Sequence, residues 1–172
     1  LTVLTWRSAS WSERKKLNED MIRLIRAFDT EKIPLVAGFD WAYDLTPLNQ
    51  EPIEAEGIGY VTHPYANQRS KPWPPKWEED FGFAASRHPV FATEFGFSTG
   101  RGPEVADDDY GKAIINYLED RGISWAAWCY DPEWGPTLLK SWNYDLPGSG
   151  AVFKQAKQSK GGKCAVSATG RA

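Results

Sequence analysis

The chain has 172 residues, of which 41% are hydrophobic, and its 20 basic and 23 acidic side chains leave a formal net charge of −3. This composition predicts one globular domain with a sizeable core. The absence of a basic excess argues against nucleic acid as a partner. No apolar stretch approaches the roughly 20 residues that span a bilayer, so no membrane partner is expected.

The first residues lack the basic region and the long apolar run of a signal peptide, and a secreted or periplasmic location stays open. Two cysteines, Cys129 and Cys164, stand in unlike surroundings without CxxC or Cys/His spacing. No GxGxxG or Walker pattern follows a predicted strand. We therefore expect neither a metal nor a cofactor, and the sequence does not decide whether the two cysteines form a disulfide.

Helical segments recur along the chain. Residues 12–28 carry apolar side chains at helical spacing with charges on the other face, which predicts an amphipathic helix. A loop with a short helix is expected at 45–56, a Pro-rich loop at 64–75, helices at 77–86 and 104–120, a C-terminal cap at Gly122 and a short helix at 151–157. The domain is expected to cover 1–158, and the Gly-, Ser- and Lys-rich residues 159–172 to form a flexible tail.

Strands are predicted between these helices, because short apolar runs that read as buried strands alternate with them. The order indicates a parallel α/β fold in which the loops after the strands share one face, where active sites of such folds lie. The four predicted strands cover 33–38, 57–62, 88–95 and 123–129.

Each predicted strand ends in polar or aromatic side chains, and a shared site explains four such ends better than four unrelated structural residues. Glu94 is the clearest candidate for a functional residue, because it is a carboxylate within the apolar run VFATEFGF at 90–97. The other ends are Asp40 with Trp41, His63 with Tyr65, and Trp128 with Tyr130.

Nine tryptophans in this length are unusual. Aromatic side chains supply buried area, and most of these rings are expected in the core or in lid packing, but they also form flat faces for sugar rings. The tryptophans in short Pro- and Gly-rich stretches favour a carbohydrate platform; these are Trp73, Trp77, Trp128 and Trp134.

The succession AGFDW, THPYANQ, VFATEFGF and WAAWCY, within residues 12 to about 158, resembles the second half of a family 5 glycoside hydrolase. That family comprises cellulases and related enzymes on a (β/α)8 barrel. The resemblance implies that Glu94 is the nucleophile, that Tyr65 hydrogen-bonds its carboxylate, and that His63 contacts substrate hydroxyls. It implies that Trp128 stacks on a sugar and that Trp41 ends the family's fifth strand. Further substrate contacts are assigned to Asp40, Asn67, Tyr130 and Trp134.

The family's general acid/base lies in an Asn-Glu-Pro motif at the end of the fourth strand, and this chain has no such motif. Its Asn-Glu-Asp at 18–20 falls inside the first predicted helix, and residues 1–5, where the fourth strand is expected, hold no carboxylate. Asp131 and Glu133 are the alternative acids in the same chain.

Half of a barrel leaves open sheet edges and an uncovered apolar face. We therefore predict a homodimer in which two copies close eight strands. The two Glu94 side chains would then face each other across the barrel mouth. A separation of about 5–5.5 Å would suit a retaining mechanism and roughly 6.5–9.5 Å an inverting one.

The sequence predicts a glycosidase of the endo-β-1,4-glucanase type acting on β-linked glucans, with weak activity where the acid is missing. A β-glucan or its oligosaccharide is the expected substrate, and the linkage is not decided between β-1,4 and β-1,3. Two alternatives stay open. One is a non-catalytic carbohydrate-binding half barrel, and the other is a fragment that needs its N-terminal half.

Overall fold

A computed structural model describes residues 9–96, 108–133 and 141–143 of the chain. Within these residues one parallel sheet has the strand order β1-β2-β3-β4, so each strand lies beside the next one in the sequence. A sheet wound in one direction in this way is the arrangement of a (β/α)8 barrel. The strands are β1 (Leu35–Ala37), β2 (Gly59–Thr62), β3 (Val90–Ala92) and β4 (Ser124–Trp125).

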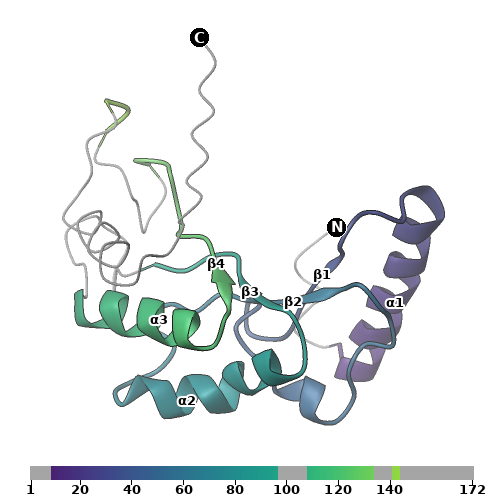
Figure 1. Ribbon diagram of the computed structural model, residues 1–172, viewed down its shortest axis with the longest axis horizontal. Helices are drawn as coiled ribbons and strands as arrows, with labels where there is room; N and C mark the ends of the chain where they lie inside the picture. The colour runs from purple at the N-terminus through teal and green to yellow at the C-terminus, as the bar shows by residue number, and fades with distance from the viewer. Residues whose placement is uncertain (1–8, 97–107, 134–140, 144–172) are drawn as a thin grey trace.

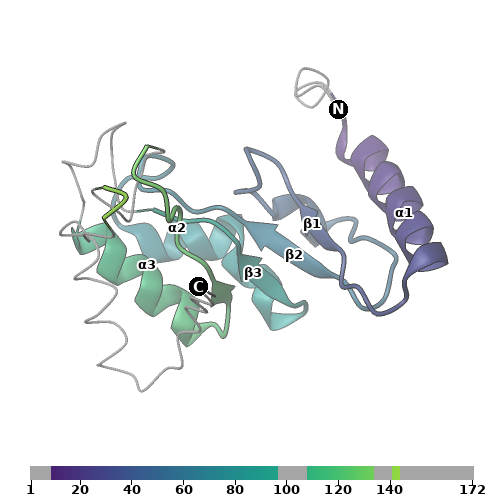
Figure 2. The ribbon, with the colours of Figure 1, turned by 90° about the horizontal axis from the view of Figure 1, so that it is seen from above.

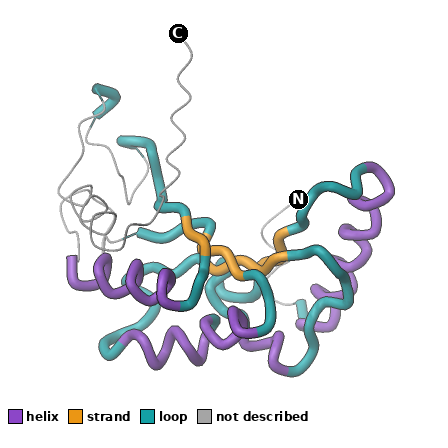
Figure 3. The backbone as a smooth tube through the Cα atoms, in the orientation of Figure 1, coloured by secondary structure: helices purple, strands orange, loops and turns teal. Residues whose placement is uncertain are grey.

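The helices do not surround the sheet. Figure 1 shows α2 and α3 on the same side of it, while α1 lies beyond β1 at the other end of the molecule from α3. Figure 2 shows the same separation from above, and Figure 3 shows the short strands bordered by helices. The helices are α1 (Trp11–Phe28), α2 (Trp73–Asp80) and α3 (Asp108–Asp120), with 3-10 turns η2 (Thr46–Asn49) and η3 (Gly82–Ser86).

Two helix ends follow from local chemistry. Ser10 caps α1 in a capping box: its hydroxyl accepts from the Glu13 N–H at 3.3 Å, and Glu13 accepts from the Ser10 N–H at 2.8 Å. Gly122 follows α3 with φ of 65°, a left-handed conformation that suits glycine. The predicted first helix and the predicted cap at Gly122 are confirmed.

The predicted helix at 77–86 is wrong in its bounds. Helix α2 begins at Trp73, inside the stretch expected to be a loop, because Pro74 and Pro75 occupy its first turn, where no backbone N–H is needed. It ends at Asp80, and the separate turn η3 follows. The predicted helix at 151–157 and the tail at 159–172 lie outside the described residues, as does the start of the predicted helix at 104–120.

The two faces of the sheet differ in burial. Successive side chains of a strand point to opposite faces, and Val36, Tyr60 and Val90 of one face are at most 5% exposed. On the other face Leu35 is 47% exposed, so the expectation of a fully buried first strand is wrong. The edge position of β1 among the described strands is not enough to explain this, because Val36 on the same strand is 2% exposed; the difference follows the face to which each side chain points.

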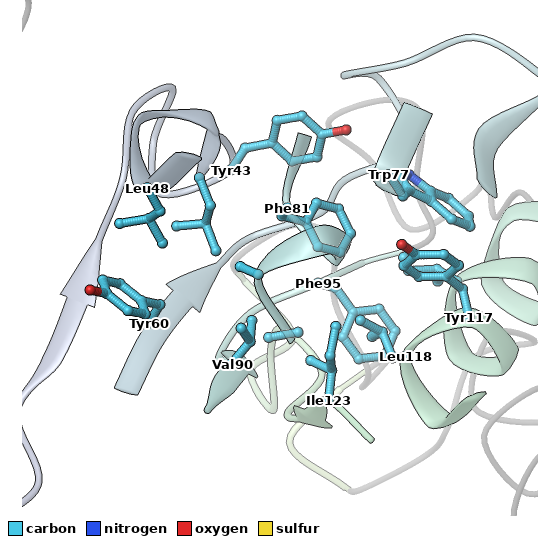
Figure 4. Packing of buried hydrophobic residues seen from close by; sticks show 14 of the residues in the cluster. Tyr43, Leu48, Tyr60, Trp77, Phe81, Val90, Phe95, Tyr117, Leu118 and Ile123 are labelled. Atoms are coloured by element: carbon cyan, nitrogen blue, oxygen red, sulfur yellow. The ribbon is translucent and has the colours of Figure 1, made fainter. Parts of the chain in front are cut away.

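Aromatic rings fill the core between the sheet and the helices (Figure 4). Trp73 and Trp77 stack with ring centroids 6.0 Å apart, and Tyr110 meets both rings edge-on at 5.2 and 5.5 Å. Trp77 is 1% exposed. These two tryptophans therefore serve the core, and the prediction that they belong to a carbohydrate platform is wrong.

Helix α1 contacts the rest of the chain through several polar groups and through Ile22, which is part of the core. Trp11 Nε1 donates to the Glu51 carbonyl at 2.6 Å, Glu19 accepts from the Glu54 N–H at 2.9 Å, and Arg26 donates to the Gly57 carbonyl at 2.9 Å. Of the apolar side chains that recur at helical spacing on α1, Ile22 is buried at 6% exposure, and the other five are 37–85% exposed. We call them the α1 stripe: Leu17, Met21, Leu24, Ile25 and Phe28.

Among the described residues, no helix combines the length and the apolar character needed to cross a membrane.

Candidate active site

The sheet register brings the ends of β2 and β3 together. Val61 pairs with Phe91, so the residues two positions further along each chain, His63 and Thr93, are neighbours on the same face. Their side chains make a hydrogen bond of 2.8 Å between Nε2 and Oγ1. Sequence reasoning missed Thr93. The signal that could have found it is its position one residue before Glu94, level with His63.

Glu94 receives a hydrogen bond from the neighbouring strand exit. Tyr65 Oη donates to Glu94 Oε2 at 3.0 Å, and His63 Nδ1 lies 3.6 Å from the same oxygen. A parallel bridge between Tyr65 and Gly96 extends the pairing of the two chain segments past their strands. His63, Tyr65 and Glu94, which the sequence placed on two separate strand ends, therefore form one cluster.

Both residues that contact Glu94 favour their neutral forms. Burial raises the pKa of Tyr65, and the nearby Glu94 carboxylate raises it further. The hydroxyl therefore stays protonated and can donate a hydrogen bond. Burial lowers the pKa of His63 from its ordinary value, and the Glu94 carboxylate opposes this only in part. His63 is therefore neutral at pH 7.

The loop after β2 holds Tyr65 by its backbone. Gln68 Oε1 accepts from the Tyr65 N–H at 2.6 Å, and the Gln68 N–H donates to the Tyr65 carbonyl at 3.2 Å. Asn67 is exposed on this same turn. The reciprocal hydrogen bonds close the turn, so the phenol is directed by a defined piece of backbone.

A tight turn after β1 presents Trp41. Phe39 and Asp44 exchange backbone hydrogen bonds of 2.9 and 3.1 Å across it. Between them Asp40, Trp41 and Ala42 have φ values of 49°, 52° and 70°, which residues with a side chain rarely adopt in succession. Asp40 is exposed, and the Trp41 side chain is 70% exposed. The turn thus directs a large apolar ring into solvent.

The exit from β4 lies beside the exit from β3. The Trp128 N–H donates to the Phe95 carbonyl at 2.8 Å, one residue beyond Glu94, and the Trp128–Cys129 peptide bond is cis. Trp128 is half-buried and Tyr130 is 59% exposed. Burial, followed by the charge of Asp131, raises the pKa of the Cys129 thiol.

The alternative acids have partners close to them in the sequence. Asp131 Oδ1 accepts from the Glu133 N–H at 2.7 Å, and Glu133 Oε1 accepts from Trp142 Nε1 at 3.2 Å. Trp134 lies outside the described residues. In the part of the chain that the structure describes, no group of three or more His, Cys, Asp or Glu side chains could hold a metal ion.

Comparison with known proteins bears on this arrangement of strands and side chains. Residues 4–133 match the family model of cellulase, glycosyl hydrolase family 5. The chain belongs to this family. The resemblance found in the sequence motifs is therefore confirmed, and the fold is part of a (β/α)8 barrel.

Two curated relatives are endoglucanases. Endoglucanase E-5 of Thermobifida fusca is 26% identical over 160 residues, which are 89% of this chain and 31% of that protein. Endoglucanase Z of Dickeya dadantii is 27% identical over 165 residues, which are 93% of this chain and 38% of that protein. The chain thus spans less than two fifths of the length of these relatives.

Solved structures agree on the fold. The β-glucanase SdGluc5_26A from Saccharophagus degradans, in its native form and in complex with cellotetraose, is 41% identical with a TM-score of 0.81. The match covers 88% of this chain and 48% of that one. The catalytic domain of endoglucanase Cel5A from Thermobifida fusca, at 24% identity and a TM-score of 0.71, shows the same fold.

Proposed function

We propose that this chain carries the nucleophile of a β-glucan hydrolase, with Glu94 as that nucleophile. The observation that carries the proposal is the 3.0 Å hydrogen bond from Tyr65 to Glu94 at the mouth of a cellulase-family sheet. A substrate of β-linked glucose units is supported by the endoglucanase relatives and by the β-glucanase solved with cellotetraose.

In the proposed first step a Glu94 oxygen attacks the anomeric carbon as the bond to the leaving oxygen breaks. Tyr65 holds the carboxylate by donating to Oε2, which leaves Oε1 as the attacking atom. The leaving oxygen takes a proton from a general acid. Water then attacks the anomeric carbon and breaks its bond to Glu94, and the deprotonated acid group takes up the water's proton. Neutral His63, held by Thr93, offers its ring to substrate hydroxyls without adding a charge beside the developing oxocarbenium ion.

Aromatic rings at the strand exits are proposed to bind the sugars. Trp128, adjacent to Phe95, would stack on the unit beside the cleaved bond, and exposed Trp41 would stack on another unit. The remaining proposed substrate contacts are Asp40, Asn67, Tyr130 and Trp134.

The general acid is proposed to come from a second half barrel. The α1 stripe is exposed, and so are Ile33 at 65% and Leu35 at 47% exposure beside and on the β1 edge. The chain covers 48% of the matched β-glucanase chain, so a region of equal size corresponds to the other half. For this chain by itself, we propose that a second copy covers these apolar side chains, which would bring two Glu94 carboxylates to one mouth. In cis, Asp131 and Glu133 stay the candidate acids.

Covalent trapping tests the nucleophile without requiring the acid. A 2,4-dinitrophenyl 2-deoxy-2-fluoro-β-cellobioside has a leaving group that departs unprotonated, and the fluorine slows release of the sugar from the enzyme. We expect mass spectrometry to find one fluorosugar on Glu94 in the native chain and none in Glu94→Gln. Exposed Glu31→Gln is the control and should label normally. A label on another carboxylate would contradict the proposal, and cellotetraose binding without label or turnover would instead support the non-catalytic alternative.

A further inference from the structure

Asp80, at the end of α2, is a buried carboxylate outside the catalytic cluster. It is 6% exposed and accepts from Arg69 Nε at 2.6 Å, from Arg69 Nη2 at 2.7 Å and from Tyr43 Oη at 2.6 Å. Its backbone carbonyl also accepts from the Leu45 N–H at 2.8 Å. One residue thus holds the chain after β1 and the chain after β2 at the same time.

Tyr43, one of the partners of Asp80, supports the strained turn that presents Trp41. Tyr43 lies two residues after Trp41 and is 2% exposed. Its carbonyl accepts from Thr62 Oγ1 at 3.0 Å, and its hydroxyl reaches Asp80. Three successive left-handed residues persist only where surrounding contacts hold them. The buried tyrosine provides such contacts at the end of the turn.

Arg69, the other side-chain partner of Asp80, closes the loop that begins with His63 and Tyr65. Arg69 lies four residues after Tyr65, binds Asp80 with both arms of its guanidinium, and its carbonyl accepts from Trp73 Nε1 at 3.0 Å. A two-armed pair fixes orientation as well as distance. The loop is therefore anchored to α2 at its far end, while Tyr65 reaches Glu94 at its near end.

The charges in this network stabilise it. We call Asp80 with Arg69 and Tyr43 the Asp80 clamp. Burial disfavours the charged form of Asp80, yet hydrogen bonds from Arg69 and Tyr43 outweigh this and hold its pKa below the usual range. The same pair raises the pKa of Arg69. Loss of one partner would leave a buried charge without compensation.

From this geometry we propose that Asp80 is a positioning residue, which holds the turn presenting Trp41 and the loop carrying Tyr65 in a fixed relation to each other. The inference rests on the proposed function, because that function makes Trp41 and Tyr65 glucan-facing. Asp80 itself acts through the two loops and not by contact with substrate.

The chain offers a matched control in a second network of the same chemistry. Glu78 accepts from Tyr117 Oη at 2.6 Å and from Arg121 Nη1 at 2.8 Å, and it joins α2 to α3 instead of to the two loops. Glu78→Gln therefore perturbs a Tyr–carboxylate–Arg group on the same helix. Any effect special to the substrate loops should appear in Asp80→Asn and not in Glu78→Gln.

Hydrogen exchange of the full chain tests the clamp without any substrate. We expect Asp80→Asn to speed amide exchange in both 39–44 and 63–69 by at least about tenfold, while Glu78→Gln leaves both segments unchanged. Tyr43→Phe, which keeps the Arg69 pair, should speed exchange in 39–44 alone and serves if Asp80→Asn fails to fold. Unchanged exchange in the two loops would overturn the proposal.

Kinetics on cellotetraose test the positioning role. Asp80→Asn should raise KM about tenfold, and combining it with Trp41→Ala should raise KM no further, because both changes remove the same Trp41 contact with the glucan. Additive losses, or a loss of stability alone as in Glu78→Gln, would overturn the positioning role. Absence of binding and turnover in the native chain would contradict the proposed function, and the exchange experiment would still decide the clamp.

Discussion

Tyr65 and Glu94 leave neighbouring parallel strands and meet through a single hydrogen bond, from Tyr65 Oη to Glu94 Oε2 at 3.0 Å. The donor is kept protonated by burial, which raises the Tyr65 pKa. The hydrogen bond fixes the orientation of the Glu94 carboxylate through the Tyr65 hydroxyl. A conservative substitution, Tyr65→Phe, removes this hydrogen bond alone.

Removing that hydroxyl should slow turnover. A hydrogen bond to a charged group contributes about 1.5–3 kcal/mol, so Tyr65→Phe should lower kcat/KM on an aryl cellobioside by about 10- to 100-fold. The matched control is Tyr117→Phe, which removes a buried hydroxyl bonded to Glu78 away from the site. Steady-state rates check the expectation, and equal losses in both variants would assign the effect to folding.

Stability should fall as the pH drops below the ordinary histidine pKa. Burial lowers the folded-state pKa of His63, and it also lowers that of His88, with Arg87 adding to the effect. Below pH of about 6.5 the unfolded chain therefore binds protons that the folded chain refuses, and folding becomes less favourable.

Urea unfolding between pH 5 and 8 measures this dependence. His63→Gln and His88→Gln should each flatten the curve in part. A native curve that is flat over this window, or one that neither variant alters, would rule out the assignment to these histidines.

The α1 stripe should control assembly. Leu24 and Phe28 are 60% and 85% exposed, and charging both as Leu24→Glu with Phe28→Glu should weaken a dimer at least about tenfold. Light scattering over a range of concentrations measures the mass, with Arg23→Ala on the same helix as the control. A native chain that stays a monomer would contradict the second copy. A 1:1 complex with the N-terminal half of the Saccharophagus β-glucanase would then assign the α1 stripe to a preceding half barrel.

Two glycines should differ in what an added methyl group does. At Gly38 a Cβ would lie 1.9 Å from the Asp44 backbone carbonyl oxygen, so Gly38→Ala must open the turn that presents Trp41 and should destabilise the fold by at least about 3 kcal/mol. At Gly122 the space is open and only the positive φ is unfavourable, so Gly122→Ala should cost about 1 kcal/mol. Denaturant unfolding compares the two, and a reversed order would refute the close approach at Gly38.

The placement of the cluster formed by His63, Tyr65 and Glu94 was predictable because the strands of a parallel sheet end at the same edge. His63, Tyr65 and Glu94 each follow an apolar run, and runs of this kind in parallel strands end at one edge. Distances between their atoms were not predictable, since they depend on the register that pairs Val61 with Phe91. Thr93 and the Asp80 network were missed for the same reason: their partners are distant in the sequence and are set by packing.

The sequence by itself determined the family, the strand order along the chain and the residue types at each strand exit, because these depend on local apolar periodicity and on short motifs. Only the tertiary structure decided which aromatic rings face solvent. Trp73 and Trp41 read alike in the sequence, yet Trp73 is packed against Trp77 while Trp41 stands on a left-handed turn. It also decided how α1 packs: Ile22 and several polar groups contact the chain, while the α1 stripe is exposed. The physical reason is that a side chain is buried only where another surface packs on it. The periodicity of a helix shows which side chains share a face, but it does not show what packs on that face.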